Sequence, residues 1–365
     1  MSTSICATLK DPTLFREANY IDGQWLPAKA GHAIAIHNPA NGELVGHVPA
    51  FGAEETARAI AAAKKALPAW RALTAKERAG LPAGVCNVIT GPSKGIGGEL
   101  TANQDVRKLS FTGSTEVGAQ LLAQCAPTIK KTSMELGGNA PFIVFDDADL
   151  DAAVAGAVAS KYRNAGQTCV CTNRFLVQDS VYDAFAAKLK AAVAKLKVGN
   201  GLDDGVTIGP LINPDAVEKV REHIADAVEH GASVLLGGKP DALGGNFFTP
   251  TILTDVPRTA KIFREETFGP VAPLIRFSQE ADAVEMANDT PFGLAAYFYS
   301  RDIGRVMRVA EALEYGIVGI NEGLISTEVA PFGGMKHSGL GREGSKYGIE
   351  DYLEIKYLCL GGVDA

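Results

Sequence analysis

The sequence predicts an α/β fold in which helices cover a mainly parallel sheet. Short apolar, strand-like runs alternate along the chain with longer amphipathic patterns, which is typical of such sheets. The chain has 365 residues, of which 46% are hydrophobic and 21% charged. This length corresponds to two or three domains, and the composition permits a large packed core.

The N-terminal half predicts one long helix and a strand–helix–strand unit. Residues 54–67, EETARAIAAAKKAL, are Ala-rich and acidic at the start, and we expect Pro68 to stop this helix. Residues 85–90 and 108–111 are predicted strands, and residues 95–101 predict a short helix between them.

The C-terminal half continues the alternation. PFIVF at residues 141–145 predicts a buried strand, and Asp147 or Asp149 can cap the helix that leads from it toward Cys169. The following segments predict amphipathic helices at 182–196, 214–230 and 303–313, separated by apolar runs such as 233–236 and 295–299.

Composition also limits the classes of function. A net charge of -7, a pI near 5.5 and the lack of a long Lys/Arg run argue against nucleic acid or an anionic membrane as the main partner. No apolar run of about eighteen residues and no apolar leader occur. Six cysteines follow no zinc-ligand spacing and suggest a reducing compartment. We therefore expect a cytoplasmic protein with a small-molecule substrate and no metal; the cysteines are Cys6, Cys86, Cys125, Cys169, Cys171 and Cys359.

The segment YRNAGQTCVCT at residues 162–172 is the strongest functional feature, because it places Cys169 in a polar, glycine-containing loop after a helix. A lone cysteine is more often a small buried hydrophobe, so a catalytic interpretation needs a base and oxyanion donors. Glu135 in MELGGN is the candidate base, since the two adjacent glycines allow close approach of another group. A glutamate in such a turn can equally be solvated.

FTGSTEVG at residues 111–118 is a candidate anion site. Ser114 or Thr115 can cap a helix whose free N–H groups face a phosphate, and Gly113 lets the backbone approach it. The spacing is not GxGxxG, and an ordinary capped helix explains it equally.

Two further residues near Cys169 have two interpretations each. Arg163 is either a helix-end cation or a fork that binds a substrate carboxylate. Cys171 either packs in the core or forms a strained redox pair with Cys169. The loops REETFGP and PFGGMKHSGLG are turn-rich and by themselves indicate only structured loops.

Together, these segments resemble the aldehyde dehydrogenase superfamily. FTGSTEVG, MELGGN, GQTC, EETFGP and PFGGMKHSGLGRE occur in that family's order, and Glu135 precedes Cys169 by the 34 residues such enzymes use. KYRNAGQTCVCTNR and ISTEVAPFGGMKHSGLGREGSKYGIEDYLEIKY are similar to the succinate-semialdehyde dehydrogenase branch.

The resemblance implies oxidation of succinate semialdehyde to succinate with NADP or NAD, in a homo-oligomer. Cys169 would attack the aldehyde, and Glu135 would activate water to hydrolyse the thioester. The resemblance also implies that the cofactor's pyrophosphate contacts Gly113 and Ser114, that its nicotinamide ribose contacts Glu266, and that its nicotinamide ring lies near Phe268 and Phe332. It implies that Arg163 and Ser326 bind the substrate carboxylate, and that Cys171 can form a regulatory disulfide with Cys169.

The resemblance also implies an incomplete Rossmann-like cofactor domain at residues 1–135, an α/β catalytic domain at 136–340, and a C-terminal segment at 341–365 with an oligomerisation strand over 352–360. After Gly80 the chain lacks a long stretch that family members carry. That stretch supplies the PWNFP-type loop with its oxyanion-hole Asn, the KP-type lysine, the first cofactor-domain strands, one carboxylate-binding arginine and part of the interface. We therefore expect impaired turnover, lower solubility or altered assembly.

Two alternatives stay open at this point. One is a catalytically inactive remnant that docks on intact subunits through residues 352–360, because an apolar edge strand suits that role. The other is a cofactor-independent thiol esterase that uses Cys169 and Glu135. Glu322 in GINEG is a second departure from the branch, which has a small neutral residue there.

Overall fold

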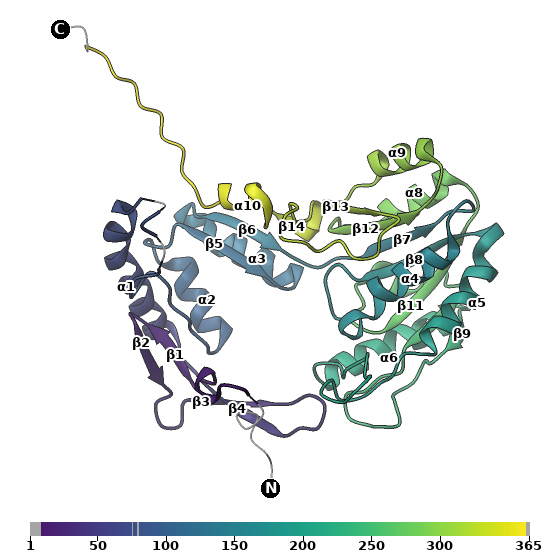
Figure 1. Cartoon of the computed structure of the whole chain (residues 1–365), viewed down its shortest axis with the longest axis horizontal. Coiled ribbons are helices and arrows are strands. Elements are labelled where there is room, and N and C mark those ends of the chain that lie inside the picture. Colours follow the sequence, from purple (N-terminus) through teal and green to yellow (C-terminus); the bar gives the residue numbers. More distant parts are fainter. Residues whose placement is uncertain (1–8, 75, 79, 363–365) are drawn as a thin grey trace.

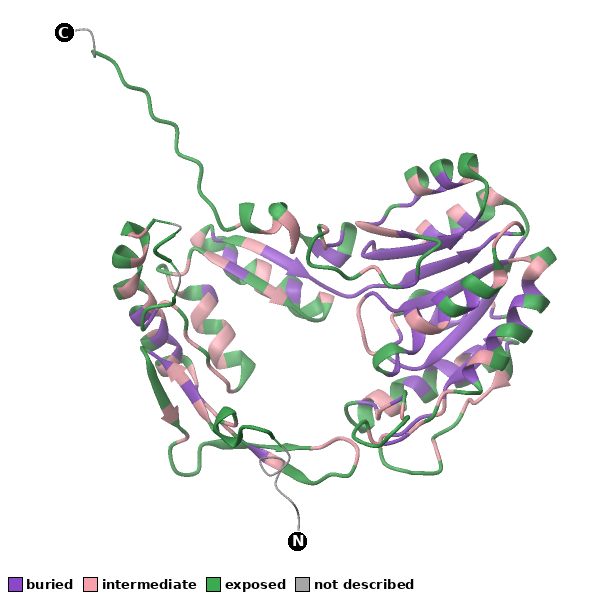
Figure 2. Cartoon of the chain, viewed as in Figure 1, coloured by how far each residue is buried: buried purple, intermediate pink, exposed green. Residues whose placement is uncertain are grey.

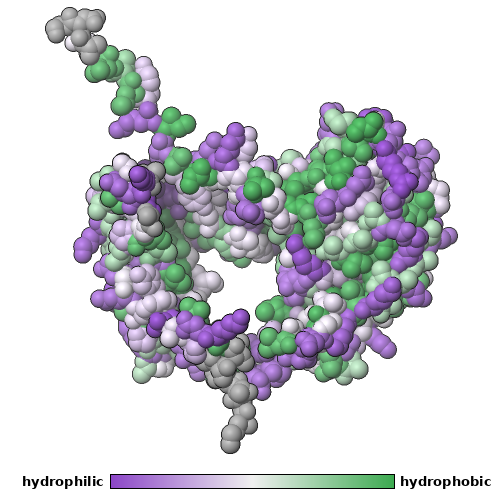
Figure 3. Space-filling view, viewed as in Figure 1, coloured by the Kyte–Doolittle hydropathy of each residue, from purple (hydrophilic) through white to green (hydrophobic). Residues whose placement is uncertain are grey.

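The computed structural model describes residues 9–74, 76–78 and 80–362, and it contains two lobes (Figure 1). The larger lobe surrounds a seven-stranded sheet, and the smaller one holds a three-stranded sheet and two antiparallel strand pairs. An opening separates the lobes in the space-filling view (Figure 3). Asn246 Nδ2 donates a hydrogen bond of 3.3 Å to the carbonyl of Pro39 across the far end of that opening.

The seven-stranded sheet forms the core of the larger lobe. Its order is β13-β12-β7-β8-β11-β10-β9, and every pairing is parallel except that of β9 with β10. The strands are β7 (Ala140–Val144), β8 (Thr172–Gln178), β9 (Ser233–Leu236), β10 (Thr251–Thr254), β11 (Val271–Phe277), β12 (Ala295–Tyr299) and β13 (Ile317–Ile320). All residues of β7 and β12 are buried (Figure 2), as expected for parallel strands covered on both faces.

Helices cover this sheet and confirm most of the predicted elements. They are α4 (Leu150–Tyr162), α5 (Tyr182–Val193), α6 (Pro214–Glu229), α7 (Lys261–Arg264), α8 (Glu280–Asn288) and α9 (Ile303–Ala312). Asp149 caps α4, because its side chain accepts from the N–H groups of Asp151 and Ala152. Asp147 instead accepts hydrogen bonds from the Ser300 hydroxyl and from two backbone N–H groups beside it.

The smaller lobe carries Glu135 at the end of a strand. Its sheet has the order β14-β6-β5, with β5 parallel and β14 antiparallel to β6. The elements of this part of the chain are β1 (Ala18–Ile21), β2 (Gln24–Pro27), β3 (Ala33–His37), β4 (Leu44–Pro49), α1 (Ala53–Ala72), α2 (Ser93–Ala102), β5 (Lys108–Thr112), α3 (Thr115–Cys125), β6 (Lys131–Glu135), β14 (Gly339–Leu340) and α10 (Ser345–Glu350). Within the described residues β5 pairs only with β6, so its other edge is free.

The prediction that Pro68 ends the first helix is wrong. Helix α1 runs from Ala53 to Ala72 and contains Pro68. The proline lacks an N–H and removes one helical hydrogen bond, but it is exposed, so water can solvate the carbonyl left without a donor.

The predicted strand over residues 85–90 is also wrong. Only Val88 makes a β-bridge, to Tyr20, with hydrogen bonds of 2.8 and 3.0 Å between the two backbones. A strand needs a neighbour along its whole length, and in the described chain this apolar run meets one bridge partner only. The unpaired run and the free edge of β5 lie in the part of the fold from which the resemblance implies missing strands.

The predicted C-terminal strand is not formed within this chain. Residues 353–362 carry no regular secondary structure, and the segment extends away from the body (Figure 1). Ile355 is 100% exposed, Leu358 79% and Leu360 80%. An extended segment becomes a strand only when a neighbour supplies hydrogen bonds, and no such neighbour exists in the described part of the single chain.

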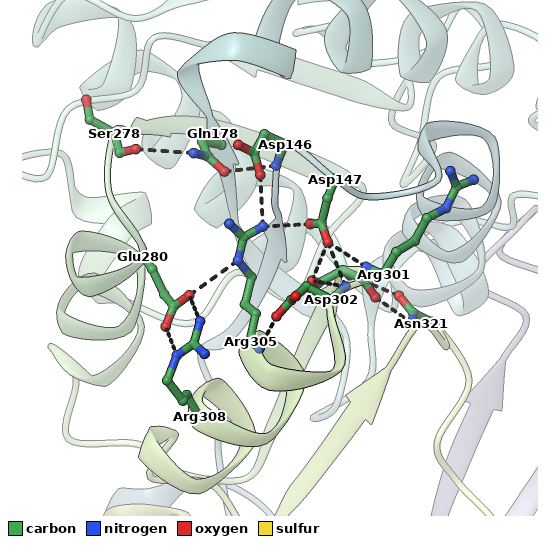
Figure 4. Close-up of polar contacts among 11 residues, drawn as sticks. Asp146, Asp147, Gln178, Ser278, Glu280, Arg301, Asp302, Arg305, Arg308 and Asn321 are labelled. Carbon is green, nitrogen blue, oxygen red and sulfur yellow. Dashed lines mark hydrogen bonds and ion pairs between the residues drawn. The ribbon is translucent and has the colours of Figure 1, made fainter.

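Ion pairs close the carboxyl edge of the large sheet (Figure 4). Arg305 of α9 bonds through Nη1 to Asp146 Oδ1 at 2.8 Å and to Asp147 Oδ1 at 2.6 Å, just after β7. Its Nε donates to Glu280 of α8 at 3.3 Å, and Glu280 also pairs with Arg308. Cys169 comes three residues before the first residue of β8, so the site around it lies at the opposite, amino edge of the sheet.

The exposed C-terminal segment generates a prediction about assembly. Replacing Ile355 and Leu358 together by Lys removes apolar surface that only another chain can cover, and it should weaken self-association at least about tenfold. Sedimentation velocity at matched concentrations measures this. The matched control is the Leu202→Lys, Ile303→Lys variant, whose side chains are similarly exposed elsewhere. An unchanged mass distribution in the first variant would contradict the prediction.

Candidate active site

Cys169 lies in a loop whose path depends on unusual backbone geometry. After α4, residues Arg163–Gly166 form a short turn in which Asn164 and Ala165 have φ of 54° and Gly166 has φ of 75°. A Cβ on Gly166 would lie 2.1 Å from the carbonyl oxygen of Gly269. Glycine is therefore required there, since it allows the cysteine loop to contact the loop that carries Glu266 and Phe268.

Glu135 and Cys169 approach each other across a glycine pair. Glu135 ends β6 and is only 5% exposed, which corrects the interpretation of a solvated turn residue. A Cβ on Gly138 would lie 2.5 Å from the Cys169 carbonyl oxygen, and one on Gly333 would lie 2.9 Å from Glu135 Oε1. Glu135 Oε2 is buried without a hydrogen-bond partner in the described chain. An unpartnered buried carboxylate oxygen is a costly group that suits a site where a proton is exchanged.

The electrostatics of the pair keep both groups protonated at neutral pH. Burial raises the pKa of Glu135 to about 8, the Glu343 charge adds to this shift, and Arg342 opposes it. Burial also raises the pKa of the Cys169 thiol to about 11, with further contributions from the carboxylates of Glu266 and Glu135. Cys169 at rest is therefore a thiol and needs a base to become a nucleophile.

Glu266 joins the same site from the loop between α7 and β11. Its Oε1 accepts a 2.8 Å hydrogen bond from the N–H of Gly138. Burial raises the pKa of Glu266 to about 7, while the Gly138 hydrogen bond and the Lys161 charge act in the opposite direction. The Gly137–Gly138 segment is thus held between Glu266 and the Cys169 carbonyl.

The predicted phosphate turn adjoins Glu135. The N–H of Gly113 donates to the carbonyl of Glu135 at 3.0 Å, and Ser114 Oγ accepts from the N–H of Val117, which makes Ser114 the N-cap of α3. Gly113 and Ser114 are both exposed. Phe268 is exposed and Phe332 is half-buried, so both rings can be reached from solvent.

Arg163 and Ser326, the predicted carboxylate ligands, are both exposed. The Arg163 charge acts on the Tyr297 hydroxyl, as do Cys171 and Cys169, which places the three groups in one region. Glu322 turns back on its own loop, where Oε1 accepts from the N–H groups of Gly323 and Leu324 at 2.8 and 2.9 Å.

Cys171 packs in the core beside the site. It is 1% exposed, its Sγ contacts the Thr168 hydroxyl, and it lies 4.0 Å from the Arg163 carbonyl oxygen. Both Cys169 and Cys171 are free thiols. The redox role of Cys171 stays a prediction. Cys6 lies outside the described residues.

Sequence reasoning missed several polar groups that support the site. Lys161 and His223 have no exposed surface, and Thr267 has 1%. Arg342 and Glu343 act electrostatically on Glu135. The available signal was a lysine in the otherwise apolar run AAVAGAVASKY and a histidine on the buried stripe of α6.

The described residues hold no group of three or more His, Cys, Asp and Glu side chains arranged for a metal ion. Among the same residues, no helix has the length and apolar composition needed to cross a membrane.

Known proteins match this chain over nearly all of its length. The sequence model of the aldehyde dehydrogenase family matches residues 25–79 and 77–358, in two pieces that meet near Gly80. A glutarate-semialdehyde dehydrogenase of Pseudomonas aeruginosa is 52% identical over 481 residues, covering 97% of this chain and 100% of the relative. An NADP succinate-semialdehyde dehydrogenase of Escherichia coli is 51% identical over 479 residues, covering 97% and 99%.

The solved structures agree. A succinate-semialdehyde dehydrogenase from Burkholderia pseudomallei has a TM-score of 0.95 and 48% identity, covering 97% of this chain and 100% of that one. The alignments span about 480 positions, whereas this chain has 365 residues, so the relatives carry a long segment that is missing here.

The buried carboxyl of Glu135 generates a prediction about stability. Its pKa of about 8 in the folded state lies above the ordinary value of 4.5, so the folded state holds the proton more tightly. The unfolding free energy should therefore fall as pH rises from about 4.5 to about 8. Relative to the parent, Glu135→Gln should gain ~2–4 kcal/mol, or roughly 3–5 °C in Tm, between pH 5 and pH 9.

Thermal melts of both proteins across this pH range measure the difference. Glu311→Gln, at an exposed position on α9, is the control and should show no pH-dependent gain. A constant offset between Glu135→Gln and the parent at every pH would refute the buried-carboxyl argument.

Proposed function

The chain belongs to the aldehyde dehydrogenase family, and we propose that it oxidises succinate semialdehyde to succinate with NADP or NAD, at a rate reduced by the missing segment. The observation that carries the proposal is the convergence of Cys169, Glu135 and Glu266 around the Gly137–Gly138 segment. The names of the succinate-semialdehyde dehydrogenase relatives support the choice of substrate.

The chain's own residues account for the covalent steps. The Cys169 thiol loses its proton to the Glu135 carboxylate, and the sulfur adds to the aldehyde carbon to form a hemithioacetal whose oxygen carries the negative charge. Loss of hydride from that carbon leaves a thioester on Cys169. Glu135, after releasing its first proton to solvent, takes a proton from water, the hydroxide adds to the thioester, and the carboxylate product leaves with the Cys169 thiol restored.

The nicotinamide, when bound, supplies the acceptor for the hydride. The residues present fit the cofactor: an exposed Gly113–Ser114 turn opens α3, and Glu266 presents a half-buried carboxylate beside Gly137. Phe268 and Phe332 offer accessible rings. We propose these five residues as the cofactor contacts, and the lysine that relatives use for the adenosine ribose has no counterpart here.

Arg163 is the proposed ligand of the distal substrate carboxylate, with Ser326 as a second donor. The guanidinium is exposed and lies on the turn that delivers Cys169. A planar guanidinium binds a carboxylate through two parallel hydrogen bonds, which favours an aldehyde with an acid at its far end.

Turnover should be slow for two reasons. The PWNFP-type loop is absent from the sequence, so one oxyanion donor of the family is missing, which costs roughly 10²- to 10³-fold in comparable enzymes. The Cys169 pKa of about 11 and the Glu135 pKa of about 8 also leave little ionised base or nucleophile at pH 7.

Production of reduced nicotinamide from succinate semialdehyde, with NADP and with NAD, tests the function. We expect a slow reaction that is abolished in Cys169→Ala and whose rate rises with pH until Glu135 ionises near pH 8. Folded protein without this activity would contradict the proposal. Retained ester hydrolysis at Cys169 without nicotinamide would instead indicate a thiol esterase, and neither activity would indicate a non-catalytic subunit.

A second test addresses Arg163. Arg163→Met should raise the KM for succinate semialdehyde roughly 10- to 100-fold, because a charge-assisted hydrogen bond contributes ~1.5–3 kcal/mol. The rate with propanal, which has no carboxylate, should change little and serves as the internal control. Equal losses with both aldehydes would remove Arg163 from the proposed substrate site.

A further inference from the structure

Lys161 is a buried charge that the proposed chemistry does not use. It lies in the last turn of α4, eight residues before Cys169, and has no exposed surface. Burial lowers the pKa of its ammonium group to about 8, and the neighbouring Cys171 and Glu266 act in the opposite direction. Burying an ammonium group is costly, so its presence calls for a compensating role.

The polar contact of Lys161 is with Thr267, in the loop that carries Glu266 and Phe268. Lys161 Nζ donates to the Thr267 carbonyl oxygen at 3.5 Å. The N–H of Thr267 donates to Asn173 Oδ1 at 2.8 Å, from β8. The Thr267 hydroxyl lies 2.8 Å from Nδ1 of His223, from α6. Each polar group of Thr267 is thus held by a buried side chain from a different element.

The His223 contacts fix the direction of the hydrogen bonds. Nε2 of His223 lies 3.3 Å from Glu265 Oε2, and a carboxylate can only accept, so we assign the ring proton to Nε2. Nδ1 then accepts from the Thr267 hydroxyl. Burial lowers the pKa of His223, with Lys219 contributing in the same direction, which keeps the ring neutral and this arrangement intact.

We propose that Lys161 is a positioning residue that holds the Glu265–Phe268 loop, and with it Glu266, against the helix leading to Cys169. Burial and the Glu116 charge raise the pKa of Glu266, and the Lys161 charge lowers it. Glu266 accepts a hydrogen bond from the N–H of Gly138, which borders Cys169. The consequence for cofactor contact rests on the role proposed for Glu266 above.

Hydrogen exchange of the protein without cofactor tests the proposal directly. In Lys161→Met the loop is no longer held in place, which loosens the hydrogen bonds that the N–H groups of Thr267 and Gly138 donate. Peptides over 265–269 and 136–140 should therefore exchange roughly tenfold faster. Peptides over β10 and β11 should be unchanged. Lys161→Arg keeps the charge and should restore part of the protection.

The melting temperature separates positioning from a purely structural role. The folded pKa of Lys161 lies below the ordinary 10.5, so the stability cost of burying it is full below about pH 8 and disappears as pH rises toward 10.5. Lys161→Met should therefore melt at the same or a higher temperature than the parent at pH 7, and the difference should vanish by about pH 10.5.

The control is Lys188→Met, which removes an exposed lysine paired with Asp151 on the neighbouring helix. This variant should leave the hydrogen-exchange rates of peptides 265–269 and 136–140 unchanged. Unchanged hydrogen exchange of peptides 265–269 and 136–140 in Lys161→Met would overturn the proposal. A lower melting temperature combined with faster hydrogen exchange over the whole protein would also overturn it. The measurement involves neither cofactor nor turnover. Its result therefore does not depend on whether the protein has dehydrogenase activity.

Discussion

The site depends on backbone segments that approach more closely than any side chain would allow. Gly138 meets the Cys169 carbonyl, Gly166 meets the Gly269 carbonyl, and Gly333 meets the Glu135 carboxylate, each at a distance where a Cβ would overlap. These contacts join the two sheets and the C-terminal loop at the amino edge of the large sheet. The Arg305 and Glu280 ion pairs (Figure 4) lie at the opposite, carboxyl edge.

Burial of charge around these glycines has a cost that the fold must offset. Arg174 of β8 has no exposed surface, and it donates to the carbonyls of Asn139, Met286 and Ala287 and to the Tyr315 hydroxyl. The Tyr315 hydroxyl also donates to the Ala287 carbonyl, so Arg174 and Tyr315 together satisfy these buried acceptors. Glu135 has no such partner for Oε2, so its charge is disfavoured and its proton is retained to higher pH. The same burial that rigidifies the site therefore sets its protonation.

The missing segment affects the smaller lobe more than the larger one. The seven-stranded sheet encloses a continuous core, and within the described residues only its end strands β13 and β9 have a free edge. The smaller lobe has a three-stranded sheet in which β5 has a free edge, and its residues 85–90 make one bridge. Cys169, Glu135 and Glu266 are held largely by elements outside the deletion, so their geometry survives. Of the proposed cofactor contacts, Gly113 and Ser114 lie in this smaller lobe, whereas Glu266 and Phe268 lie in the larger one.

The sequence by itself determined the alternation of strands and helices, a buried strand near 141–145, and the ordered motifs around Cys169 and Glu135, because local propensity and glycine placement specify them. It left the helix cap open between Asp147 and Asp149, and the structure decided for Asp149. It did not determine strand formation at 85–90 or 352–360, since pairing requires a partner that the chain does not contain. Pro68 was misjudged because the cost of a helical proline depends on solvent access. Only the tertiary structure decided the burial of Glu135 and the joining of Lys161, His223 and Asn173 at Thr267. These depend on contacts between residues far apart in the chain, which no local pattern encodes.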